Sequence, residues 1–162
     1  CRSSKKLVPV TGRRAEFQEV VDRLVAGMDL PDRAGEMHVK DVAVRKGQGT
    51  ASLGLDRYYV LVEGPRADAT DDLIIEFKQA RRSALTGLVP PSDYRVDGAA
   101  DRIAHAQNVQ LVNGDIFYGS VEFDGLSFMS RERAPFRDDI DMDELSYKTW
   151  KKYAKIHVSI SW

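Results

Sequence analysis

The sequence has few of the features that would place it in a specialised class. One cysteine in 162 residues excludes an internal disulfide framework and a zinc site built from cysteines. The 24 Lys and Arg are balanced by 25 Asp and Glu, and a net charge of −1 excludes a generally basic nucleic-acid-binding protein. No stretch approaches the roughly 18 uninterrupted apolar residues that a membrane span needs. We therefore expect a cytoplasmic protein with no nucleic-acid partner and no membrane span.

The two ends of the sequence are unusual. Cys1 stands where an initiator methionine is expected, and the residues after it lack the apolar segment of a signal peptide. Two explanations stay open: the lipidated cysteine of a mature lipoprotein, or a boundary made by proteolysis or cloning, which is the simpler. The other end stops at Trp162 without a polar tail. Both ends look cut, and we expect a fragment of a longer protein.

Apolar residues at helical spacing predict three helices. Residues 14–28 carry a stripe with the i, i+3, i+4 spacing of a packing helix: Phe17, Val20, Val21, Leu24, Val25 and Met28. Residues 99–112 predict a second helix, with Ile103, Ala106 and Val109 on its packed face. Residues 142–156 predict a third, because acidic residues lie near its start and lysines toward its end.

Between these helices the pattern predicts strands. Residues 39–44, 58–62 and 73–78 are rich in β-branched and aromatic residues, and their short connections indicate an antiparallel meander. Residues 116–118 and 121–123 are followed by Asp124-Gly125 and residues 126–129, and Asp-Gly here is a strong hairpin signal because both turn positions need positive φ. The order α, three strands, α, two strands, α predicts the α+β class. We expect an antiparallel sheet of about five strands with a packed helix, plus N- and C-terminal helices.

A glycine-rich connection joins the first two predicted strands. Gly47, Gly49 and Gly54 would let the backbone approach phosphate oxygens, and Thr50 and Ser52 would add hydroxyl donors. It is neither a P-loop nor a dinucleotide fingerprint, because a strand follows it and not a helix. A glycine-rich turn between strands, with a lysine such as Lys78 on the next strand, is the arrangement that protein kinases place over ATP. The alternative is a flexible turn beside a solvated edge lysine.

The sequence offers no pattern for a metal site or a catalytic triad. The three histidines, His38, His105 and His157, lie on different predicted elements. The acidic run at residues 138–144 lacks the glycine and the spaced ligands of a calcium loop, so a solvated helix start explains it better. No nucleophile-elbow motif is present. We therefore assign no catalytic and no metal-binding residues.

Several ordered motifs resemble a bacterial family known as domain of unknown function 2252. They cover about residues 36–157 and comprise residues 41–45, 47–54, 59–64, 77–80 with Ser83, 102–107, 115–119 and 129–132. Members of that family are longer and look like distant relatives of the protein-kinase-like fold. The resemblance thus implies that this chain corresponds to the small, nucleotide-binding lobe of a larger protein.

The resemblance also implies a division of the chain and roles for its residues. Residues 1–36 would be an N-terminal helical segment, residues 37–134 the small lobe, and residues 135–162 the start of a second lobe. ATP, with Mg²⁺, would be the ligand. The residues expected at its site are Gly47, Gly49, Thr50, Ser52 and Gly54 over the phosphates, Lys78 in contact with them, and Arg131 and Glu132 at the hinge.

Two departures from the kinase pattern matter. The helix after Lys78 offers Gln107 and Gln110 where kinases supply a glutamate, and no His-Arg-Asp or Asp-Phe-Gly motif occurs. We therefore expect a nucleotide-binding lobe of a phosphotransferase that is incomplete and inactive as this chain. Its partner would be a missing C-terminal lobe. The alternative is a non-catalytic interaction or dimerisation module, with a second copy of the chain as partner.

Overall fold

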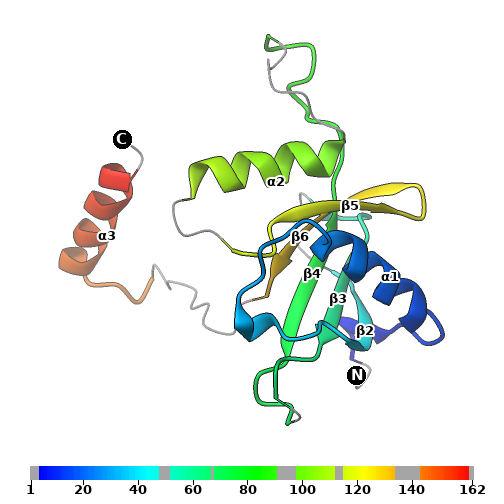
Figure 1. The fold of residues 1–162 in the computed structure, drawn as a ribbon. Coiled ribbons are helices and arrows are strands. Elements are labelled where there is room, and N and C mark those ends of the chain that lie inside the picture. Colours follow the sequence, from blue (N-terminus) through cyan, green and yellow to red (C-terminus); the bar gives the residue numbers. More distant parts are fainter. Residues whose placement is uncertain are drawn as a thin grey trace.

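The computed structural model describes residues 4–47, 52–66, 68–90, 98–111, 115–133 and 143–160 (Figure 1). Its elements in chain order are β1 (Leu7–Pro9), α1 (Arg14–Val25), the 3₁₀-helix η1 (Asp32–Ala34), β2 (Val39–Arg45), β3 (Arg57–Val62), β4 (Leu73–Gln79), α2 (Ala99–Gln110), β5 (Gly119–Phe123), β6 (Leu126–Glu132) and α3 (Tyr147–Ile160).

The described strands form one six-stranded antiparallel sheet in the order β1-β2-β3-β4-β6-β5. The α+β class and the meander β2-β3-β4 are confirmed. The number of strands was too low, because β1 was not predicted. β1 pairs with β2 from Leu7 opposite Arg45 to Pro9 opposite Ala43. A three-residue strand that ends in proline carries little β signal, and an edge tolerates proline because one side of the strand needs no donor.

The hairpin between β5 and β6 is confirmed. Asp124 has φ of 52° and Gly125 has φ of 68°, as the predicted turn requires. The run at residues 121–123 lies in β5, which begins at Gly119, whereas residues 116–118 are not part of the strand. The carboxylate of Asp115 accepts the backbone N–H of Phe117 at 2.8 Å, so these residues form a turn.

One face of the sheet is closed by α1. The predicted stripe of this helix is buried at Phe17, Val20, Val21 and Leu24. It packs against aromatic residues of the strands, which are Tyr58, Phe77, Phe123 and Phe128. The ring of Phe17 lies 4.9 Å from that of Tyr58 and 5.4 Å from that of Phe123. This face therefore holds the main core of the domain.

The helix α2 covers β5 and β6 on the other face. Met129 belongs to its cluster, whereas the neighbouring Phe128 belongs to the α1 side, and side chains alternate along a strand. The predicted packed face of α2 was wrong in part: Ala100 and Ala104 are buried, and Val109 is 71% exposed. Alanine methyl groups let the helix approach the strands closely, which larger side chains at these positions would prevent.

The last helix begins later than predicted. Residues 143–146 are not helical, and α3 starts at Tyr147, where the Ser146 hydroxyl accepts the backbone N–H of Thr149 at 3.3 Å. In Figure 1, α3 stands apart from the sheet. In the described ranges, no helix combines the length and the apolar character that crossing a bilayer requires.

Candidate functional site

The face of the sheet that α2 only partly covers carries an unusual set of side chains. We call it the open face. It consists of residues that alternate with the buried core positions of four strands: Asp41, Ala43 and Arg45 of β2, Arg57, Tyr59 and Leu61 of β3, Ile74, Glu76 and Lys78 of β4, and Arg131 with the following Arg133 at the end of β6.

Three cations lie side by side on the open face. Arg57 is directly opposite Lys78, and Arg45 follows Val44, the partner of Tyr58, so it lies next to Arg57. The Nε of Arg45 is buried and has no hydrogen-bond partner among the described residues. Like charges on neighbouring strands repel, so this cationic row (Arg45, Arg57 and Lys78) favours the presence of an anion.

A buried carboxylate lies in the next row of the same face. The side chain of Glu76 is 1% exposed, and its Oε1 lies 3.1 Å from Nη1 of Arg57. Its other oxygen accepts a hydrogen bond from Nε of Arg131, the residue directly opposite on β6. A buried charge needs such partners because desolvation is costly. Glu76 thus offsets only part of the positive charge that the cationic row and Arg131 supply.

The glycine hairpin between β2 and β3 borders the cationic row. A hollow of about 220 Å³ lies here, lined by residues from both sides of the connection, including Arg45, Gly47, Ser52, Gly54 and Arg57. Gly47 and Gly54 have φ of 68° and 75°, which a residue with a side chain adopts only with strain. Nη2 of Arg57 donates to the Ser52 hydroxyl at 3.4 Å. The hairpin and the cations therefore face one small space.

The structure places only some of the predicted site residues together. It brings Gly47, Ser52, Gly54 and Lys78 to the same end of the sheet, whereas Gly49 and Thr50 lie outside the described residues. Arg131 shares the open face and contacts Glu76. Glu132 does not join them: its carboxylate accepts Nη1 and Nη2 of Arg33 in η1, at 3.0 and 2.6 Å.

Sequence reasoning missed Arg45, Arg57 and Glu76. Arg45 is the last residue of β2 and Arg57 is the first residue of β3, on either side of the glycine hairpin. Because antiparallel neighbours joined by one connection place its flanking residues side by side, this symmetry was the available signal. Glu76 had a signal too, as the only charged residue within the apolar run from Leu73 to Phe77.

An apolar hollow lies further along the open face. It has a volume of about 230 Å³ and is lined by Leu7, Asp41, Val42, Ala43, Tyr59, Leu61 and Ile74. Leu61 is four residues from Arg57 on β3, which places the two about 13 Å apart at the usual strand rise. One face therefore combines a cationic row with an apolar hollow.

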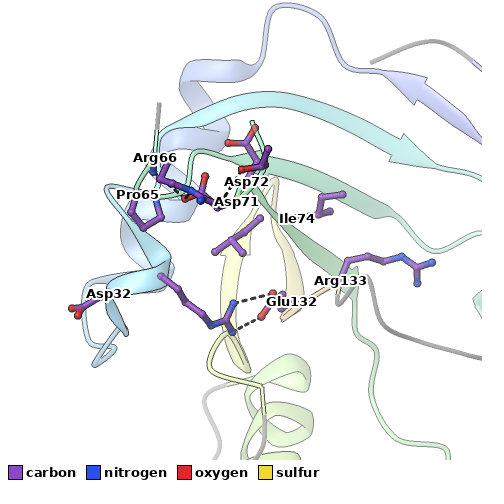
Figure 2. Close-up of a pocket in the computed structure, with 11 residues that line it drawn as sticks. Asp32, Pro65, Arg66, Asp71, Asp72, Ile74, Glu132 and Arg133 are labelled. Atoms are coloured by element: carbon purple, nitrogen blue, oxygen red, sulfur yellow. Dashed lines mark hydrogen bonds and ion pairs between the residues drawn. The ribbon is translucent and has the colours of Figure 1, made fainter. Parts of the chain in front are cut away.

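A larger hollow, of about 880 Å³, lies at the other end of the sheet from the glycine hairpin. Figure 2 shows the residues that line it. Four of its charged side chains pair with one another: Arg33 with Glu132, and Arg66 with Asp71 at 3.3 Å. The carboxylate of Glu132 raises the pKa of Arg33. Arg133 lies 5.7 Å from the centre of the Tyr59 ring. Its internal pairing makes this hollow a weaker candidate than the cationic row.

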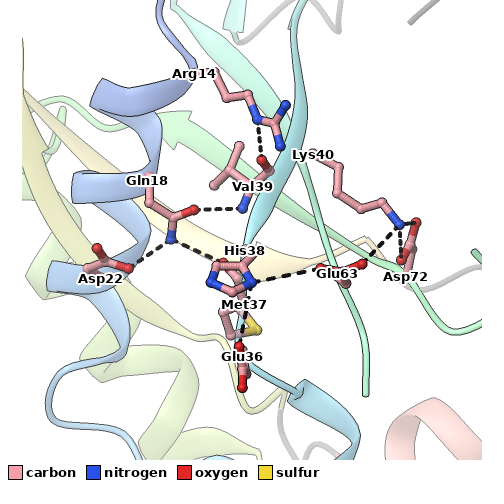
Figure 3. Close-up of polar contacts among 10 residues, drawn as sticks. All are labelled: Arg14, Gln18, Asp22, Glu36, Met37, His38, Val39, Lys40, Glu63 and Asp72. Atoms are coloured by element: carbon pink, nitrogen blue, oxygen red, sulfur yellow. Dashed lines mark hydrogen bonds and ion pairs between the residues drawn. The ribbon is translucent and has the colours of Figure 1, made fainter. Parts of the chain in front are cut away.

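A second polar cluster holds α1 to β2 (Figure 3). The amide of Gln18 accepts the Val39 N–H at 2.7 Å and donates to the Met37 carbonyl at 3.3 Å. Nε of Arg14 donates to the Val39 carbonyl at 2.5 Å. These bonds satisfy backbone groups at the start of β2, so the cluster is structural. No group of three potential metal ligands occurs within the part of the chain that the structure describes.

Comparison with curated proteins and with solved structures gave no match. A family model described as "Uncharacterized protein conserved in bacteria (DUF2252)" matches residues 3–159, nearly the whole chain. The family resemblance of the sequence motifs is thereby confirmed. The chain belongs to the bacterial family DUF2252.

Proposed function

We propose that this chain binds a nucleotide on the open face, with the phosphates under the glycine hairpin. The observation that carries the proposal is the cationic row, Arg45, Arg57 and Lys78, beside that hairpin. Guanidinium groups recognise phosphate oxygens through paired N–H donors, and a lysine adds a point charge. Backbone N–H groups in a glycine-rich turn supply further donors.

The rest of the face supports a nucleotide over a bare phosphate. The apolar hollow at Tyr59, Leu61 and Ile74 begins one row beyond Arg57 and Lys78. The separation of about 13 Å between Arg57 and Leu61 suits a ligand with a flat apolar group at one end and phosphates at the other. A base would lie over the apolar side chains, and the phosphates would reach the hairpin.

The order of elements supports a kinase-like relation. A glycine hairpin, a lysine on the following strand and then a helix, α2, follow one another as in the ATP-binding lobe of protein kinases. Among the described residues no ion pair joins Lys78 to a carboxylate of α2, and Gln107 of that helix has its Oε1 buried and unpaired. We therefore propose nucleotide binding, with phosphoryl transfer dependent on residues of a further lobe.

The residues around the hairpin do not fit Mg²⁺. Their carboxylates are Asp56, which lines the hairpin hollow, and Glu76, which two arginines already engage. Magnesium is bound through carboxylate and phosphate oxygens, and cationic neighbours oppose it. The expected ligand of this chain is therefore the nucleotide itself.

Calorimetric titration with ATP, with and without Mg²⁺, tests the proposal. We expect measurable binding in EDTA and at least tenfold weaker binding for Lys78→Ala. Lys151→Ala, which removes the same charge from the exposed surface of α3, serves as the matched control and should leave the affinity unchanged. Absence of binding by the wild-type chain, or equal affinities of all three proteins, would contradict the proposal.

A second candidate function is that of an interaction module that forms a dimer. The observation in its favour is α3, whose large apolar side chains are exposed, including Tyr147 at 75% and Trp150 at 45%. Burial of such groups against a second copy would stabilise a dimer. Light scattering of the wild-type chain and of Trp150→Ala tests this candidate. A monomeric mass for both proteins across the accessible concentrations would exclude it.

A further inference from the structure

We propose that Arg131 is a positioning residue of the phosphate site and acts through Glu76 on Arg57. The inference rests on the proposed function and assigns to Arg131 a role different from that of a hinge residue. Arg131 has no place in the cationic row, since it lies opposite Glu76, one row away from Lys78. Its effect on a phosphate would therefore come through the carboxylate that it shares with Arg57.

Arg57 connects the buried carboxylate with the hairpin. Its Nη1 lies 3.1 Å from Oε1 of Glu76, and its Nη2 donates to the Ser52 hydroxyl at 3.4 Å. The guanidinium thus has one edge on Glu76 and another toward the hollow where the phosphates would bind. A stronger ion pair with Glu76 would therefore make the Arg57 guanidinium less able to bind a ligand in the hollow.

Arg131 determines how many oxygens of the Glu76 carboxylate can interact with Arg57. The side chain of Glu76 is 1% exposed, so water cannot compensate its charge, and the two arginines are the partners that the structure provides. Nε of Arg131 occupies Oε2, which leaves Oε1 for Arg57. Without Arg131, both oxygens of the buried carboxylate would compete for Arg57 and draw it away from the hairpin.

This reasoning predicts an order of affinities that a purely structural role would not produce. In Arg131→Gln, Glu76 should hold Arg57 alone, and the Kd for ATP and for inorganic tripolyphosphate should rise about tenfold. Arg131→Lys keeps the charge and should stay within about threefold of the wild type. The double variant Glu76→Gln/Arg131→Gln removes the competing carboxylate and should restore the affinity to about that of the wild type.

The matched control is Arg133→Gln. Arg133 follows β6 on the same face and loses the same charge, but its cationic group packs on the Tyr59 ring and not on Glu76. We expect its Kd for tripolyphosphate, which has no base to contact Tyr59, to change less than threefold at 0.15 M salt. Thermal unfolding of each variant shows whether it is folded. If Arg131→Gln does not fold, Glu76→Gln carries the test, and it should lower the Kd several-fold by releasing Arg57.

The outcomes separate the two proposals. No binding of ATP or tripolyphosphate by the wild-type chain would overturn the proposed function itself. Binding by the wild type with no effect of Arg131→Gln would overturn only the role of Arg131. Equal losses in Arg131→Gln and Arg133→Gln would also overturn it, because they would indicate a general field effect. So would a failure of the double variant to regain affinity.

Discussion

Replacing Phe17 with alanine tests whether α1 belongs to the same core as the sheet. Phe17 is fully buried, and its ring lies 4.9 Å from that of Tyr58 on β3 and 5.4 Å from that of Phe123 on β5. The substitution removes the only aromatic ring that α1 places between these two strands. If α1 and the sheet share one core, the whole domain should become less stable.

The magnitude follows from these contacts. Burying a phenylalanine side chain contributes roughly 1.5–3 kcal/mol, and each aromatic pair adds about 0.5–1.5 kcal/mol. The cavity that remains raises the cost further, so we expect a loss of about 3–5 kcal/mol in the free energy of unfolding. Domains have roughly 5–15 kcal/mol in total, and at about 2–4 °C per kcal/mol the Tm should fall by roughly 6–20 °C.

Urea unfolding followed by circular dichroism and by tyrosine fluorescence measures this loss. The two signals should give one shared transition at a lower midpoint. Leu53→Ala is the control, because Leu53 is 69% exposed and its loss should cost less than about 0.5 kcal/mol. A loss below about 1 kcal/mol for Phe17→Ala, or an unchanged transition of the sheet, would refute the shared core.

Two further predictions concern the loops around the sheet. Gly35 has φ of 60°, and a Cβ there would lie 2.7 Å from the Gly64 carbonyl carbon, so Gly35→Ala should lower the Tm clearly more than Gly87→Ala, which has φ of 88° but open space around it. Equal losses would contradict the clash. Burial raises the pKa of Asp115. At a pH above the ordinary aspartate pKa of about 3.9, the folded protein therefore binds a proton at this carboxylate more readily than the unfolded chain does. In urea unfolding, the stability of the wild type relative to Asp115→Asn should therefore rise as the pH falls from 7 toward 4, and a falling difference would contradict this.

The sequence was sufficient where local pattern and tertiary contacts agree. The stripe from Phe17 to Leu24 is the buried face of α1, and Asp124-Gly125 forms the turn that its two residues favour. β2, β3 and β4 were predicted because each has enough β-branched or aromatic residues to stand out on its own. These features depend on residues that are close in sequence, so they can be predicted from one sequence.

The misses depend on neighbours in space. β1 forms because Leu7 and its neighbours pair with the edge of β2, and the sequence of three residues does not indicate this pairing. The packed face of α2 follows the alanines Ala100 and Ala104, because closeness to Met129 decides burial more than side-chain size does. α3 begins after Ser146, whose hydroxyl accepts the backbone N–H of Thr149 and so caps the helix.

The same distinction applies to the candidate site. Gly47, Gly54 and Lys78 could be named from the sequence because glycines and a strand lysine form a pattern along the chain. Arg57 and Glu76 could not be related, since their contact requires the register of β3 with β4. Glu132 was grouped with Arg131 as its neighbour in sequence, and strand alternation turned it toward Arg33.

The charges of the open face call for an explanation beyond folding. Replacing a buried ion cluster by apolar side chains of similar volume is often neutral or stabilising, so the Arg57–Glu76–Arg131 contact is weak evidence of a stabilising device. The opposite face of the same strands forms a closed core of uncharged side chains, among them Val60, Ile75 and Phe77. The same sheet buries apolar residues on one face and has arginines around a carboxylate on the other. These arginines contribute little to its stability. The phosphate ligand that we propose would account for these charges, because it would bind the positive charge that Glu76 does not neutralise.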